Sequence, residues 1–338
     1  MKKYPLIDVA KLYCSILIVL IHALEIPDGH YWGNLVKSSL SSQAVPFFFL
    51  VSGFFFKKKW DTAQDKTHFM LSYVKRFLVL YGVWVIISIP EILSQYLGKY
   101  SDASIFYLAA LIFRRIIFAG YGVFWYLLVT AEVALIIGVL LKQKKEKMLY
   151  LLAAIGLVLD LIYYTRTSLP GLRSINQIFY TVFSWNNNFI MKGLPHMVLG
   201  LYFADHCEQW SLNVKHLIAA YAAVFLIHVA IFVGLYPIVE NPSRYTLLYP
   251  VQAVLLFLIA VSVEHVAISE KITCECRPLS SAIYCLHCFV IYYVINPTIG
   301  MDANTLIRTA ISVALSVGTY WIVKKTGCKP LIRLLTLK

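Results

Sequence analysis

Charged residues are scarce in this sequence. Only 14% of its 338 residues are Asp, Glu, Lys or Arg, whereas soluble globular domains carry about 25%. Apolar residues make up 60% of the chain and run in long blocks, such as residues 83–89 and 254–263. This composition leaves little material for a soluble domain. It is enough for many membrane-spanning helices, each of which needs about 20 apolar residues.

Several other features are missing. The apolar blocks lack the period-two alternation of membrane strands, which argues against a strand-built fold. No internal repeat and no low-complexity linker divides the chain, so we interpret residues 1–338 as a single integral membrane domain. No small-residue cleavage site follows Lys2 and Lys3, and the first apolar segment is long enough to span, which argues against a cleavable signal peptide.

The seven cysteines do not form the framework of a disulfide-rich secreted protein. Four of them fall in segments that we expect to be cytoplasmic loops, namely Cys207, Cys274, Cys276 and Cys328. Cys285 and Cys288 flank His287 inside an apolar segment, where a metal site is conceivable. Small packing residues are the better interpretation there, so no metal is expected.

The apolar blocks predict an all-α fold, a polytopic bundle of about ten transmembrane helices. The predicted spans are residues 7–26, 38–56, 74–95, 121–141, 148–165, 187–204, 214–236, 245–264, 280–298 and 305–323. A further apolar segment, 103–119, carries Arg114 and Arg115 near its end. We expect it to be a re-entrant or interfacial helix on the outer side, because another span would place the lysines of 142–147 outside.

Basic residues outnumber acidic ones by 30 to 17, for a formal net charge of +13. They gather at the ends of the apolar blocks, which is typical of membrane topology rather than of nucleic-acid binding. With ten spans, 20 of the basic residues fall on the side of the two termini and 9 on the opposite side, and Lys11 lies inside the first span. The positive-inside rule therefore predicts that both termini are cytoplasmic, and we expect no nucleic-acid partner.

The first span carries more ionisable residues than a membrane helix normally tolerates. Asp8 and Lys11 are three residues apart and can pair on one helical face. Lys11 and His22 are eleven residues apart, which is three turns plus about 20°, so they point the same way. Glu25 follows His22 by three residues and lies near that face. One stripe therefore carries all four candidate catalytic residues.

Histidine exchanges protons near neutral pH, and a neighbouring carboxylate can orient its ring. Such a pair suits a general base that deprotonates a hydroxyl, and it equally suits a proton relay in a transporter. The alternative interpretation is an ordinary histidine at the outer end of a helix, with Glu25 exposed to water.

Further polar residues enter other spans. Tyr73, Lys75 and Arg76 begin the third span, where a guanidinium group could bind the phosphates of a cytoplasmic donor. Glu132 and Asp160 lie well inside the fourth and fifth spans, where each is expected to face the bundle interior and pair with a cation or hydroxyl. Four residues near the outer ends are assigned to the side where an acceptor substrate would bind: Trp125, Tyr126, Arg114 and Arg115. The default interpretation of the two aromatic residues is an interfacial belt.

Several of these segments together resemble the membrane acyltransferase-3 family. Lys11 and His22, with ten residues between them, resemble the family's basic residue and histidine in the first helix. The stretch 45–54, VPFFFLVSGF, is similar to the family's second-helix block. The segments at 73–76 (YVKR), 124–127 (FWYL) and 280–287 (SSAIYCLH) resemble three later motifs in the same order.

The resemblance implies a ten-helix bundle that moves an acyl group, usually acetyl from cytoplasmic acetyl-CoA, to a hydroxyl of a glycan or lipid-linked sugar. His22 matches the family's proposed catalytic histidine, as general base or acyl carrier, and Lys11 takes the place of a residue that is commonly arginine. Lys75 and Arg76 match positions that meet the CoA phosphates. The expected location is the bacterial cytoplasmic (inner) membrane, with membrane lipid as a further partner.

Two alternatives to an acyltransferase stay open, a transporter and a catalytically inert scaffold. The segment 187–200 also resembles the membrane half of vancomycin-resistance serine racemases, in which this fold is tied to amino-acid handling. A transporter of an amino acid or glycan precursor could use the same intramembrane charges. A catalytically inert scaffold of an envelope-assembly complex is the third hypothesis, and the charges of the first span count against it.

Overall fold

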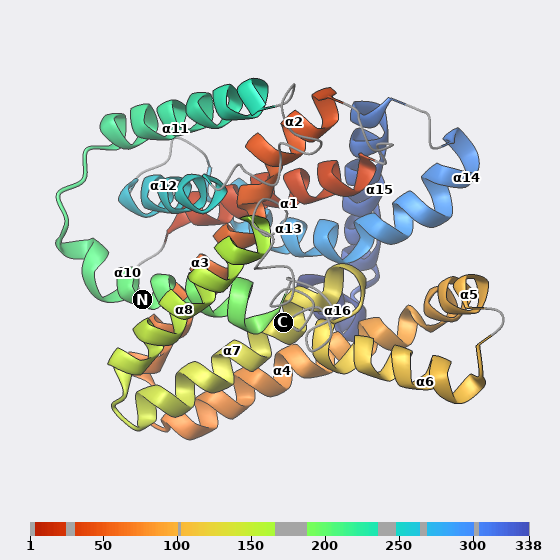
Figure 1. The fold of residues 1–338 in the computed structure, drawn as a ribbon, viewed down its shortest axis with the longest axis horizontal. Coiled ribbons are helices and arrows are strands. Elements are labelled where there is room, and N and C mark those ends of the chain that lie inside the picture. The colour runs from red at the N-terminus through yellow and green to blue at the C-terminus, as the bar shows by residue number, and fades with distance from the viewer. Residues whose placement is uncertain are drawn as a thin grey trace. The chain divides into compact units, whose positions relative to one another are not determined.

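The computed structural model describes residues 4–24, 31–100, 103–165, 188–235, 248–263, 269–300 and 304–337. Within these ranges the chain is helical and contains no strand, in agreement with the predicted all-α class. The backbone groups into two compact units, residues 1–51 with 202–338 and residues 52–201. Figure 1 shows the helices, and each unit is described by itself.

The first unit holds the two ends of the chain. Its helices are α1 (Pro5–Ala23), α2 (Tyr31–Ser39), α11 (Val214–Leu235), α12 (Tyr249–Ser262), α13 (Glu270–Val290), α14 (Asn296–Ile299), α15 (Thr305–Thr326) and α16 (Lys329–Thr336). A π-helical turn, Ile291–Ile295, joins α13 to α14. Helix α1 packs against α13 and α15. An apolar cluster holds this contact, with Val19 and Ala23 of α1 against Ile283, Val290, Ile291 and Ile295.

The second unit contains α4 (Lys66–Ile87), α5 (Ile89–Lys99), α6 (Ile105–Arg114), α7 (Trp125–Lys142) and α8 (Glu146–Thr165). Two helices, α3 (Ala44–Thr62) and α10 (Leu194–His206), cross the division at residues 51/52 and 201/202. Helices α4 and α7 pack antiparallel, because Lys142 donates a hydrogen bond to Thr67 at one end while Trp84 and Phe124 stack at the other.

Seven helical segments are long and apolar enough to cross a membrane among the described residues. They are Pro5–Ala23, Tyr31–Thr62, Lys66–Ile87, Gly122–Lys142, Val214–Leu235, Glu270–Ile299 and Thr305–Thr326. The chain is therefore a multi-pass membrane protein. Each of the other three predicted spans also contains a helix, α8, α10 or α12. The segment predicted to be re-entrant forms α6 and one π-helical turn, Arg115–Ala119.

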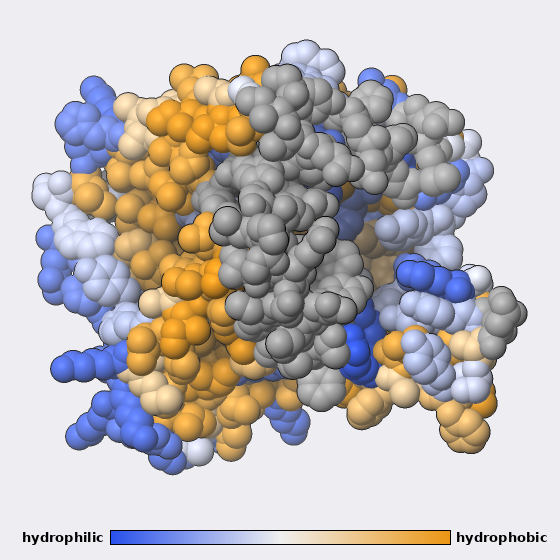
Figure 2. All heavy atoms as spheres, in the orientation of Figure 1, coloured by the Kyte–Doolittle hydropathy of each residue, from blue (hydrophilic) through white to orange (hydrophobic). Residues whose placement is uncertain are grey.

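The surface agrees with a lipid environment. Figure 2 shows apolar side chains over α8 and α11, and exposed residues there include Leu151, Val158, Leu226 and Ile227. The lysines of the turn between α7 and α8 are exposed as well, and they lie at the end of both helices. Apolar helix surfaces and exposed lysines at a helix end are the pattern expected of membrane helices.

The boundaries of the third and ninth predicted spans were wrong. The third span begins at Lys66 rather than residue 74 and ends at Ile87, where Ser88 and Pro90 start a separate helix. The ninth span begins at Glu270 rather than residue 280, so Cys274 and Cys276 are helical and do not lie in a loop. Polar residues of the first turns hid both helix starts, because an apolar window does not detect them.

Candidate functional site

The polar stripe of α1 faces α13 in the first unit. The guanidinium of Arg277 donates two hydrogen bonds to the Asp8 carboxylate, Nε to Oδ1 and Nη2 to Oδ2, both at 3.0 Å. The Lys11 ammonium lies 3.6 Å from Asp8 Oδ1, so the predicted Asp8–Lys11 pair is present but is the longer contact. The Ser280 hydroxyl donates to the Lys11 carbonyl at 3.0 Å. Arg277 of α13 therefore pairs with the polar stripe of α1, although the sequence analysis had placed it in a loop.

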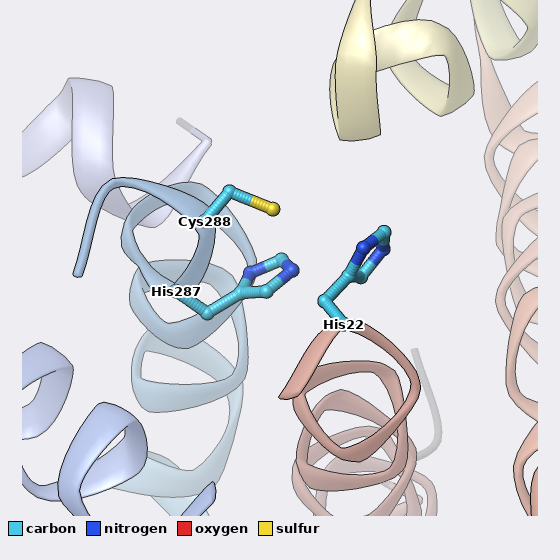
Figure 3. Close-up of side chains that lie close together, drawn as sticks. All are labelled: His22, His287 and Cys288. Carbon is cyan, nitrogen blue, oxygen red and sulfur yellow. The ribbon is translucent and has the colours of Figure 1, made fainter. Parts of the chain in front are cut away.

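His22, in the last turn of α1, lies beside His287 of α13. Their ring centroids are 5.2 Å apart, with the planes tilted by 48°. The thiol of Cys288 completes the group, and the donor atoms of the three side chains all lie within 4.8 Å of one another. Figure 3 shows the three side chains converging, His22 from one helix and the other two from its neighbour.

The hydrogen bonds of His287 fix which nitrogen is protonated. Its Nδ1 lies 2.9 Å from two backbone carbonyls, those of Ile283 and Tyr284. A carbonyl oxygen can only accept, so Nδ1 carries the proton and Nε2 of the neutral ring carries a lone pair. The residue is 0% exposed, and Nε2 has no hydrogen-bond partner among the described residues. A buried acceptor in this state is ready to bind a proton donor or a cation.

Sequence reasoning missed the role of His287. It assigned the residue to a family motif and to the packing between Cys285 and Cys288, and it relied on Glu25 to orient His22. Glu25 lies outside the described residues. The available signal was that both segments carry polar residues followed by a histidine, and the structure pairs them in the same order: 8 with 277, 11 with 280 and 22 with 287. Two helices that pair in increasing order run parallel, which brings their histidines together.

Arg76 forms the centre of a second cluster, in the other unit. Its guanidinium carbon lies 5.1 Å from the ring centroids of both Tyr73 and Phe77, on the same helix. Its Nε is buried without a hydrogen-bond partner among the residues that the structure describes. Lys75, by contrast, is exposed. Arg76 thus points among aromatic side chains of the bundle, where its guanidinium is held but its hydrogen-bonding capacity is not used up.

Tyr126 belongs to the same cluster as Arg76. Its hydroxyl lies 2.7 Å from the Ser52 hydroxyl, which also interacts with Tyr73. The sequence had assigned Tyr126 to the acceptor side and Tyr73 to the donor side, and the structure brings these two residues together. Of the other residues assigned to the acceptor side, Trp125 precedes Tyr126 at the start of α7, and Arg114 and Arg115 lie at the junction of α6 with its π-helical turn. All three are partly buried.

A buried ion pair lies elsewhere in the second unit. Lys192 donates to Asp160 Oδ2 at 2.7 Å, and each side chain is 7% exposed. The prediction that Asp160 pairs with a cation is therefore confirmed. Its partner was missed, because Lys192 had been counted among the basic residues outside the membrane. The ring of His196 bonds the Lys192 carbonyl at 2.7 Å, so the three residues form one buried polar group. Glu132 keeps a buried Oε2 without a hydrogen-bond partner in the described ranges.

Comparison with known proteins adds independent information. The family model described as an acyltransferase domain, that of the acyltransferase-3 family, matches residues 4–324. A protein of Enterococcus faecalis named amino-acid racemase is 26% identical over 257 residues. The alignment covers 74% of this chain and 35% of that relative, so the chain spans about a third of its length. No solved structure matches the chain.

Proposed function

Because the chain belongs to the acyltransferase-3 family, we propose that it moves an acyl group, most often acetyl, from cytoplasmic acyl-CoA to a hydroxyl of a cell-envelope glycan or lipid-linked sugar. The proposed location is the bacterial cytoplasmic membrane, with both termini in the cytoplasm. The positive-inside bias supports the cytoplasmic termini, and helix directions support the alternation of the spans. The first and ninth predicted spans, α1 and α13, are parallel, and the third and fourth, α4 and α7, are antiparallel, as alternating spans require.

The observation that carries the proposal is the pair of His22 and His287. With Nδ1 of His287 donating to carbonyls, its Nε2 can accept an N–H from His22 after a small rotation of either ring. His22 then keeps a lone pair on its other nitrogen. That lone pair can take the proton of the acceptor hydroxyl while the oxygen attacks the thioester carbonyl, and the CoA thiolate leaves. His287 is thus proposed as the positioning residue for His22, in addition to Glu25.

The same lone pair allows a second chemical route. His22 could attack the thioester itself and carry the acyl group before it passes to the acceptor. Single-turnover reaction with labelled acyl-CoA and no acceptor separates the two routes. Label that stays on the chain after denaturation, and that is lost in His22→Ala, supports the acyl carrier. Absence of protein-bound label supports the general base.

Donor binding is proposed for Arg76, Lys75 and Tyr73. The guanidinium is the group best suited to a phosphate, since it presents two parallel donors. In the structure it is oriented by two aromatic rings and has an unused buried Nε. Asp8 and Lys11 are proposed to keep α1 in register against α13, through Arg277, so that His22 lies at His287. Trp125, Arg114 and Arg115 are proposed on the acceptor side.

The central test uses two histidine variants and a sugar acceptor. We expect His22→Ala to lower kcat by about 10²- to 10⁴-fold, the contribution of a general base. His287→Gln should lower kcat by about 10- to 100-fold, typical of a group that acts through another, and should leave the KM for acyl-CoA unchanged. His216→Ala, an exposed histidine of α11, is the matched control. Acyl transfer at the wild-type rate by His22→Ala would contradict the proposal.

A second candidate function is transport of an amino acid or glycan precursor. The buried Asp160–Lys192 pair with His196 favours it, because charges held inside a membrane bundle are costly and mark substrate or proton pathways in transporters. Uptake into proteoliposomes without acyl-CoA, abolished in Asp160→Asn, would support transport. Uptake that needs acyl-CoA, or none at all, would count against it.

A further inference from the structure

The convergence of two imidazoles and a thiol has a use beyond base catalysis. His22, His287 and Cys288 each offer one donor atom, and the three atoms lie within 4.8 Å of one another (Figure 3). In a tetrahedral zinc site with Zn–N and Zn–S bonds of about 2.0–2.3 Å, neighbouring donors are about 3.5 Å apart. Side-chain rotations that bring the donors about 1 Å closer would make this geometry.

One ligand already has the support that metal-binding histidines need. Such residues donate the second ring nitrogen to a carbonyl or carboxylate, which fixes the tautomer and orients the ring. His287 does this through Nδ1 to Ile283 and Tyr284, and its free Nε2 is buried. The apolar cluster of Val19, Ala23 and Ile283 holds α1 against α13, so the ligands come from helices already in contact.

The donor set selects the class of metal. Two imidazole nitrogens and one thiolate suit Zn²⁺ and similar borderline or soft cations, whereas Mg²⁺ and Ca²⁺ require oxygen ligands. The thiolate of Cys288 also offsets one positive charge, which matters in an apolar helix pair. We infer that His22, His287 and Cys288 form a zinc site with three protein ligands and a fourth position open to water or another small ligand. From the sequence, a metal site at Cys285, His287 and Cys288 was conceivable but packing residues were preferred there, because the sequence could not show that His22, 265 residues from His287, lies beside them.

Zinc at this position would act as a switch. A metal-bound His22 has no lone pair, so it can neither accept a proton nor carry an acyl group. This consequence rests on the proposed function, in which His22 performs the chemistry. Zinc is therefore expected to inhibit acyl transfer reversibly, and the site itself can be tested without any acyl transfer.

The binding test uses the full-length chain without a histidine tag, in detergent, after removal of metals with a chelator. Co²⁺ serves as the probe, because a thiolate ligand gives it an intense charge-transfer absorption. We expect one Co²⁺ per chain, displaced by Zn²⁺ and not by Mg²⁺. Cys288→Ser should abolish the charge-transfer band and weaken Zn²⁺ binding by more than about 10- to 100-fold, the loss that removal of a single outer-shell partner can cause.

Cys274→Ser is the matched control, because Cys274 is an exposed cysteine of the same helix and should keep the band. Helix content by circular dichroism checks that each variant folds, and His22→Ala provides a second ligand deletion from the other helix. A band that survives in Cys288→Ser, or no saturable Co²⁺ binding in the wild type, would overturn the site.

The activity test is separate. Zn²⁺ should inhibit wild-type acyl transfer, a chelator should restore it, and Cys288→Ser should need at least 10-fold more Zn²⁺ for the same inhibition. Specific Zn²⁺ binding together with undiminished acyl transfer at saturating Zn²⁺ would contradict inhibition by zinc but would still support the zinc site. Zinc binding by a chain with no acyltransferase activity would instead count against the proposed function.

Discussion

At the scale of single residues, side-chain chemistry in this protein depends on which buried polar atoms have no hydrogen-bond partner among the described residues. Arg76 has a guanidinium oriented by Tyr73 and Phe77, with a buried Nε that no described residue accepts from. His287 has its Nδ1 fully engaged and its Nε2 free. In both cases the packing orients the group but leaves one polar atom available, which is the arrangement a ligand-binding residue requires.

Two acyl donors, acyl-CoA and acyl-pantetheine, can isolate the role of Arg76. Arg76→Lys keeps the charge but loses the two parallel N–H groups that can bind one phosphate. We therefore expect the KM for acyl-CoA to rise about 10- to 100-fold, which corresponds to the loss of one charged hydrogen bond. The KM for acyl-pantetheine, which lacks the nucleotide phosphates, should not change. Lys59→Gln, which removes an exposed cation of α3, is the control. An equal effect on both donors would show that Arg76 does not bind the phosphates.

At the scale of helices, one glycine of a recognised motif has a packing role. A Cβ added to Gly53 would lie 2.0 Å from the backbone oxygen of Met197, so α3 and α10 approach closely at this point. A backbone atom cannot move aside as a flexible side chain does. We expect Gly53→Ala to destabilise the protein by about 1–3 kcal/mol, measured by thermal unfolding in detergent.

Gly82 of α4 offers the matched comparison. Nothing lies within 4 Å of an added Cβ at Gly82. Alanine has the higher helix propensity, so Gly82→Ala should be neutral or stabilising by up to about 1 kcal/mol. Equal destabilisation of the two variants would contradict the close approach at Gly53.

The start of α4 provides a pH-dependent element. Asp65 caps the helix by accepting a hydrogen bond from the His68 amide at 2.9 Å, and this bond lowers the pKa of the carboxyl below its ordinary 3.8. A lowered pKa means that the carboxylate stabilises the fold at pH above 3.8 and loses this contribution as pH falls through the folded-state pKa.

Asp65→Asn separates this effect from other titrations, since asparagine also caps but does not ionise. The difference in Tm between wild type and Asp65→Asn should be constant near neutral pH. It should then shift in favour of Asp65→Asn as the pH drops below 3.8. A difference that does not change with pH would mean that the cap does not depend on ionisation.

Hydropathy located the helices well but not their ends. The apolar pattern found a helix for every predicted span, because membrane helices need long uninterrupted apolar runs. It missed the first turns of α4 and α13, which carry Lys66 and Arg277. Those polar turns are stable because they are capped or paired, by Asp65 at α4 and by Asp8 at α13. Such partners lie near in space and, in the second case, 269 residues away in sequence.

At the scale of the whole molecule, the family could be identified from short motifs, and the match over residues 4–324 confirms it. The residues of the site were only partly predictable. Helical periodicity placed Lys11 and His22 on one face, which is local geometry. It could not show that this face meets His287, nor that Lys192 pairs with Asp160, because contacts between distant helices depend on the packing of the bundle.

The last prediction concerns membrane topology, which depends on whether residues 103–119 cross the membrane. If they do not, the exposed turn at Lys144 lies in the cytoplasm. We expect green fluorescent protein, which matures only in the cytoplasm, to fluoresce when inserted after Lys144 or fused after Lys338, and to stay dark after Tyr100. Alkaline phosphatase, active only outside, should give the reverse pattern. Because six predicted spans separate Lys144 from Lys338, the two positions share one side of the membrane, and loss of fluorescence at both, with Tyr100 also dark, would make 103–119 a transmembrane span.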